Sequence, residues 1–187
     1  MNKFFDNFYG VLFKPSETFD KLKENPNLIQ GFIIVVLISI LSPVLSFSIN
    51  SAQNPLVQGL ELINASFWGL LSWLFFASFL EVIAGIFKKG GKTKIFLCLS
   101  AFALLPWIFL APASLFKTGG LLFKFTGVII GLASWLWSTI LTAYAIMKTY
   151  DISPQRVITF ILIPFLGGLL SFYWFFGFFT TLIQIIK

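Results

Sequence analysis

The sequence predicts an all-α, polytopic integral membrane protein: a bundle of five transmembrane helices preceded by a short amphipathic N-terminal helical region. Apolar residues make up 58% of the 187 residues and charged residues only 11%, a balance typical of membrane proteins rather than soluble domains. Carboxylates are almost absent after residue 27, where only Glu61, Glu81 and Asp151 remain. Basic residues instead lie at the ends of long apolar runs, as they do beside membrane spans.

Residues 1–27 are expected to form two short cytosolic helices. One face of residues 3–13 carries apolar side chains at helical spacing: Phe5, Phe8, Tyr9 and Leu12. Such a helix lies either in the headgroup plane of the bilayer or against its own transmembrane bundle, and the pattern leaves both open. A second, polar helix is expected with Ser16 as its N-cap, and Asn25-Pro26 ends it.

Residues 28–187 are expected to form one transmembrane domain. Five apolar runs each reach the roughly 20 residues that cross about 30 Å of hydrocarbon. They lie at 28–50, 62–87, 95–116, 121–147 and 157–186. Ser153 and Pro154 predict the N-cap and first residue of the last helix. Prolines inside the runs predict kinks at Pro43, Pro106, Pro112 and Pro164.

The distribution of lysine and arginine predicts the orientation. Ten basic residues lie on the side of the N-terminus and of the turn Lys88–Lys94, and three lie on the other side. The ten are Lys3, Lys14, Lys21, Lys23, Lys88, Lys89, Lys92, Lys94, Lys148 and Arg156, and the three are Lys117, Lys124 and Lys187. Because cytoplasmic loops carry the basic excess, the N-terminus is predicted inside the cell and the C-terminus outside.

The composition argues against an enzyme. The chain has no histidine, which removes the usual general base and the commonest metal ligand, and its one cysteine, Cys98, lies inside an apolar run. No nucleotide-binding loop, zinc spacing or nucleophile elbow is present. We therefore expect no catalytic residues, no metal and no cofactor. The net charge of +6 is spread over membrane flanks, so a nucleic acid partner is not expected either.

Glu81 is the one ionisable residue well inside a span. It lies six residues before Phe87, hence roughly 9 Å from the end of its run. Intramembrane carboxylates are costly and often functional, and with a serine face on the first run Glu81 would suit a small-solute or ion transporter or channel subunit. Alternatively, Glu81 reaches water, pairs with Lys88 or Lys89, or is protonated against a hydroxyl. The serines of this candidate polar site are Ser39, Ser42 and Ser46.

Small residues form a stripe on one face of the fourth run, opened by a GxxxG. Such a stripe lets another helix approach closely. That helix belongs to the same chain, to a second copy in a homo-oligomer, or to another membrane protein. The residues of this candidate helix-packing face are Gly127, Gly131, Ser134 and Ser138.

The turn between the second and third runs is a candidate contact for a partner protein or for anionic lipid. Lysines close to an anionic membrane surface gain about 1 kcal/mol each. The lysines concerned are Lys88, Lys89, Lys92 and Lys94. The bilayer itself is the remaining expected partner.

Several short motifs in this order resemble the Yip family, the Ypt/Rab-interacting membrane proteins, in its prokaryotic branch. They are Pro15 to Phe19, Gly90-Gly91-Lys92, Leu105-Pro106 and Tyr150-Asp151-Ile152-Ser153. The resemblance implies five spans, a cytosolic N-terminus, a place in the plasma membrane and a non-enzymatic interaction or membrane-organising role related to trafficking. Eukaryotic members contact Rab-type GTPases and self-associate. They carry a long cytosolic N-terminal region that this sequence lacks, so a Rab-binding role is not carried over.

Overall fold

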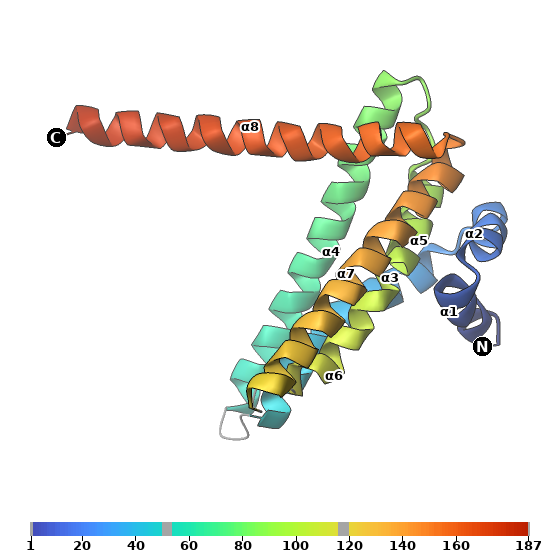
Figure 1. The fold of residues 1–187 in the computed structure, drawn as a ribbon, viewed down its shortest axis with the longest axis horizontal. Helices are drawn as coiled ribbons and strands as arrows, with labels where there is room; N and C mark the ends of the chain where they lie inside the picture. Colours follow the sequence, from blue (N-terminus) through green and yellow to red (C-terminus); the bar gives the residue numbers. More distant parts are fainter. Residues whose placement is uncertain (1, 50–53, 116–119, 187) are drawn as a thin grey trace.

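The computed structural model describes residues 2–49, 54–115 and 120–186, and its regular elements in these ranges are helical (Figure 1). In chain order they are α1 (Asn2–Phe13), α2 (Pro15–Glu24), α3 (Leu28–Ile49), α4 (Pro55–Ile86), α5 (Thr93–Ala103), the 3₁₀ helix η1 (Leu105–Phe109), α6 (Leu110–Leu115), α7 (Leu121–Tyr150) and α8 (Pro154–Ile186). The predicted all-α class is confirmed. Four segments are long and apolar enough to cross a membrane: α3, α4, the combined α5–α6 segment and α7.

The bundle consists of these four segments. The helix α3 packs on α4 and α5, and α5 packs on α7 (Figure 1). The main core lies where α5 meets the C-terminal halves of α4 and α7, with Leu80, Phe96 and Ile146 fully buried. Large apolar side chains elsewhere on α4 and α7 remain exposed, as expected for surfaces that face lipid.

The N-terminal helices form as predicted, with one correction. The helix α2 begins at Pro15, so Lys14 takes the N-cap position without a side-chain cap, and the prediction of Ser16 as N-cap was wrong. Proline suits the first helical position because the amide hydrogen that it lacks has no helical acceptor there.

The helix α1 has two apolar faces. Phe8 and Leu12 pack in or against the core of the bundle, whereas Phe5, Tyr9 and Phe13 are exposed. Of the two predicted positions, the headgroup plane and the bundle, packing on the bundle accounts for the face that carries Phe8 and Leu12.

The third apolar run is interrupted at Pro106, as its proline predicts. The helix α5 ends at Ala103, and the amide of Trp107 donates to Leu104 O at 2.9 Å within the following 3₁₀ turn. The carbonyl of Ala103 thus loses its usual helical donor, and the hydroxyl of Ser138 on α7 donates to it at 2.9 Å. By contrast, α3 continues past Pro43 as one helix.

Two helices differ from their predicted runs. The helix α4 begins at Pro55 rather than at 62, because the side chain of Asn54 caps it by accepting from the amide of Leu56 at 3.0 Å. The last run forms α8 from Pro154 as predicted, but α8 runs away from the bundle, across the axes of α4 and α7 (Figure 1). A fifth member of the bundle is therefore not confirmed.

We expect Gly69→Ala to destabilise the bundle, because a Cβ at residue 69 on α4 would lie 2.7 Å from the Cβ of Ser39 on α3. Relief requires the two helices to separate, at a cost of about 1–3 kcal/mol. The midpoint of thermal unfolding in detergent should fall by about 2–4 °C per kcal/mol.

The matched control is Gly59→Ala on the same helix, where an added Cβ meets nothing within 4 Å. It should keep or raise the midpoint, since alanine favours a helix over glycine by up to about 1 kcal/mol. Equal shifts for the two variants would contradict a close α3–α4 crossing at Gly69.

Candidate functional site

The carboxylate of Glu81, near the end of α4, joins three parts of the chain. One of its oxygens accepts the backbone amides of Gly91 and of Lys92, the latter at 3.1 Å. The other oxygen accepts the hydroxyl of Tyr150, the last residue of α7, at 2.9 Å. We call Glu81, Gly91, Lys92 and Tyr150 the Glu81 clasp. Three donors thus satisfy both oxygens of this half-buried carboxylate.

The two glycines of the turn have separate roles in this clasp. A Cβ on Gly90 would lie 3.2 Å from Gly85 Cα and 3.3 Å from the Glu81 carboxylate, so a side chain there would push the turn away from α4. Gly91 has a φ of 88°, in the left-handed region that favours glycine.

The C-terminus of α4 leads into this turn through a Schellman motif. Lys88 adopts a φ of 56°, its amide donates to Gly85 O, and the amide of Lys89 donates to Ala84 O at 2.8 Å. These bonds satisfy the last carbonyls of α4 and direct the chain back toward Glu81.

Tyr150 is held in the core as well as in the clasp. The residue is fully buried, and its ring centroid lies 5.8 Å from that of Phe96 on α5. The next residue, Asp151, ends α7 in the left-handed conformation with a φ of 51°. The motif that begins at Tyr150 therefore both ends α7 and orients a hydroxyl toward α4.

Ion pairs attach α2 to the same end of the bundle. Asp151 lies 2.5 Å from Lys23 Nζ and 2.7 Å from Lys92 Nζ, and Lys148 Nζ lies 2.6 Å from Asp20. The hydrogen bonds from Lys23 and then Lys92 lower the pKa of Asp151 from its ordinary 3.8 to about 2. The carboxylate therefore stays ionised at neutral pH, and α2 is held to α7 from two positions.

The four lysines of the turn differ in their surroundings. Lys92 is half-buried and engaged with Asp151, and its backbone amide is part of the Glu81 clasp. The other three, Lys88, Lys89 and Lys94, are exposed. A contact of the turn lysines with a partner or with anionic lipid stays a prediction, and these three are the ones whose side chains are exposed.

The structure does not bring the predicted polar site together. Ser39 lies at the crossing with Gly69, which precedes Glu81 by twelve residues on α4, roughly 18 Å along the helix axis. Ser42 lines a cavity between α3, α6 and α7. The side chain of Ser46 lies outside the described residues. Among the described side chains, Glu81, Ser39 and Ser42 thus line no common path.

The small-residue face of α7 meets the interrupted third segment of the same chain. Ser134 and Ser138 are buried, and Ser138 accepts the indole N–H of Trp107 at 3.0 Å. A Cβ on Gly131 would contact Leu110 at 3.5 Å, while Gly127 lines the cavity. The face therefore packs closely at the two serines and leaves space at Gly127.

Sequence reasoning did not identify Tyr150 or the cross-helix ion pairs. A hydroxyl was among the alternatives for Glu81, and Tyr150 lies at the end of a run on the same predicted side of the membrane, which is the signal that points to it. Within the described ranges, no three His, Cys, Asp or Glu side chains gather where they could hold a metal ion.

The apolar helices define an all-helical, multi-pass membrane protein, in which the carboxylate of Glu81 on α4 holds the following turn in place. The family model for the Yip1 domain matches residues 9–175, and the chain belongs to this family. The resemblance carried by the short motifs is thereby confirmed at the level of the family. Searches of curated proteins and of solved structures returned no match.

We expect Glu81→Ala to loosen the turn far more than Glu81→Gln. Alanine leaves two backbone amides and the buried Tyr150 hydroxyl without their acceptor, at a cost of about 1–3 kcal/mol for each buried group. Glutamine keeps an acceptor oxygen for the amides and offers an N–H to the hydroxyl. Trypsin cleavage at the turn lysines and the thermal midpoint measure the difference.

The control is Glu61→Ala, which removes an exposed carboxylate from the same helix. It should leave both the cleavage rate and the midpoint near those of the unmodified protein. A glutamine variant as damaged as the alanine variant would show that the charge of Glu81, rather than its acceptor geometry, is what matters.

Proposed function

We propose that this protein is a non-enzymatic member of the Yip1 family in the plasma membrane that presents a rigid basic surface to an anionic partner at the cytoplasmic face. Its role would be in interaction or membrane organisation related to trafficking. The observation that carries the proposal is the exposure of Lys88, Lys89 and Lys94 on a turn that the Glu81 clasp holds in place.

Rigidity supports this role because a preorganised surface loses less conformational freedom on binding. The turn is anchored to α4 and α7 through Glu81, and to α2 through the pairing of Lys92 and Lys23 with Asp151. The exposed lysines are thus presented from a fixed backbone, and their charge suits acidic side chains or anionic headgroups.

The transporter or channel alternative has less support. Both oxygens of Glu81 accept hydrogen bonds that hold the turn. Ser39 of the first span meets α4 at Gly69, which is roughly 18 Å from Glu81 along the helix. An ion pathway requires polar groups that follow one another, and these do not.

The proposed topology has a cytoplasmic N-terminus, five spans and an external C-terminus. The basic excess near the turn supports the orientation. The fifth span is supported by the length of α8, 33 residues, which exceeds the roughly 20 that a crossing requires. A crossing requires α8 to turn about residues 151–153 from its position in Figure 1.

A reporter enzyme that is active only outside the cytoplasm, fused after Lys187, should be active if α8 crosses the membrane. The same reporter inserted between Gly90 and Gly91 should be inactive, because the turn is placed inside. Reporter activity at the turn would show that the orientation is the opposite one. Reporter inactivity at both positions would show that α8 does not cross the membrane and that the protein has four spans.

Replacing Lys88, Lys89 and Lys94 together with glutamine should weaken association with an anionic surface by roughly 100-fold, at about 1 kcal/mol for each lysine. The measurement is co-sedimentation of nanodisc-embedded protein with phosphatidylglycerol vesicles, compared with phosphatidylcholine vesicles. Crosslinking in cells reports the association with partner proteins.

The control is Lys92→Gln, which removes one charge from the same turn at a side chain engaged with Asp151. It should lower thermal stability while changing vesicle binding less than any exposed single substitution. If the triple variant bound vesicles and cellular partners as the unmodified protein does, a basic docking surface would be ruled out.

A further inference from the structure

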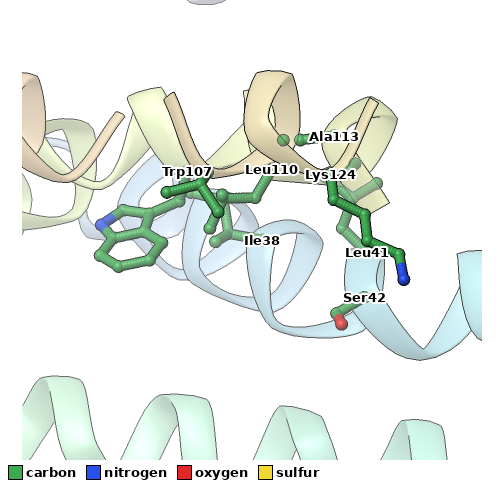
Figure 2. Close-up of a pocket in the computed structure, with 10 residues that line it drawn as sticks. Ile38, Leu41, Ser42, Trp107, Leu110, Ala113 and Lys124 are labelled. Carbon is green, nitrogen blue, oxygen red and sulfur yellow. The ribbon is translucent and has the colours of Figure 1, made fainter. Parts of the chain in front are cut away.

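A cavity of about 610 Å³ lies between α3, the η1–α6 segment and α7 (Figure 2). This volume falls within the range of about 300–1,000 Å³ that small-molecule sites occupy. Gly127 in its wall precedes Tyr150 by 23 residues on α7, roughly 35 Å along the axis. The cavity therefore lies at the opposite end of the bundle from the Glu81 clasp and is independent of the function proposed above.

The cavity is apolar along its length and cationic at one end. Its walls are mainly aliphatic: Ile38, Leu41, Leu110, Ala111, Ala113 and Val128. Figure 2 shows Trp107 at one end, and at the other end the side chain of Lys124 extending from α7 toward Ser42 on α3. Among the described residues, no carboxylate forms an ion pair with Lys124.

The walls are fixed by contacts outside the cavity. The indole of Trp107 donates to Ser138 Oγ at 3.0 Å, and Ser138 in turn donates to the Ala103 carbonyl freed by the break at Pro106. Gly127 contributes space because it has no side chain where α7 passes the cavity. The cavity is thus bounded by hydrogen bonds and close contacts within the protein itself.

We propose that this cavity binds one acyl chain of an anionic membrane phospholipid, whose phosphate pairs with Lys124. The aliphatic walls match the chain, and the ammonium of Lys124 supplies the charge that the headgroup requires. Lys124 is exposed in the first turn of α7, close to the end of a span and so at headgroup depth. A cavity with no charged residue at its end would favour no particular headgroup, whereas the ammonium of Lys124 favours an anionic one.

The test uses the purified full chain with phosphatidylglycerol or phosphatidylcholine carrying the same photoreactive acyl chain. Crosslinks located by mass spectrometry should concentrate at residues 38–42 and 107–113 and should be stronger with phosphatidylglycerol. Lys124→Gln should lower the affinity for phosphatidylglycerol about fivefold and that for phosphatidylcholine by less, because the choline ammonium already neutralises the phosphate there. Its matched control, Lys21→Gln, removes an exposed lysine on α2, away from the cavity.

A second variant, Gly127→Leu, should fill the cavity and remove these crosslinks with both lipids. Its control is Gly59→Leu, since an added Cβ at residue 59 meets nothing within 4 Å. Size-exclusion chromatography and the thermal midpoint establish that both variants fold, and Lys124→Gln changes only an exposed side chain. Crosslinks spread evenly over α4 and α7, equal labelling by the two lipids, or labelling unchanged by Lys124→Gln would each overturn the proposal.

Discussion

The rest of the structure depends on how one carboxylate inside a span is satisfied. The half-buried carboxylate of Glu81 has polar oxygens that need donors. The chain supplies two amides from the following turn and the Tyr150 hydroxyl from α7. These donors come from two different places in the sequence, so satisfying Glu81 also fixes where the turn and the end of α7 lie.

The hydrogen bonds of Glu81 also affect the neighbouring ion pairs and the exposed lysines of the turn. With Tyr150 fixed, Asp151 follows in a left-handed conformation and lies within reach of both Lys92 and Lys23. Lys92 of the turn thereby pairs within the protein, and the pairing of Lys23 holds α2 in place. The three lysines that remain exposed, Lys88, Lys89 and Lys94, therefore lie on or next to a turn whose backbone is held by Glu81.

The sequence predicts the local features of this fold and misses the long-range ones. Apolar runs locate the helices because periodicity and length are local properties, and Pro106 interrupts its segment as expected because proline acts on its own turn. Asp20 and Lys23 of α2 both find their partners 128 residues further along the chain, where sequence spacing carries no information. For the same reason neither the Tyr150 partner of Glu81 nor the course of α8 was predicted.

The two ends of the bundle differ because one proline divides the third segment. Up to Ala103, α5 is a regular helix that packs fully, and the core there is dense around Phe96 and Leu99. Beyond Pro106 the chain continues as a 3₁₀ turn and the six-residue α6. The small-residue face of α7 is covered at Ser134 and Ser138, whereas Gly127 lines a cavity together with Ala111 and Ala113 of α6. A stripe that would mediate close contact between two continuous helices thus borders a cavity where its partner is an interrupted segment with small side chains.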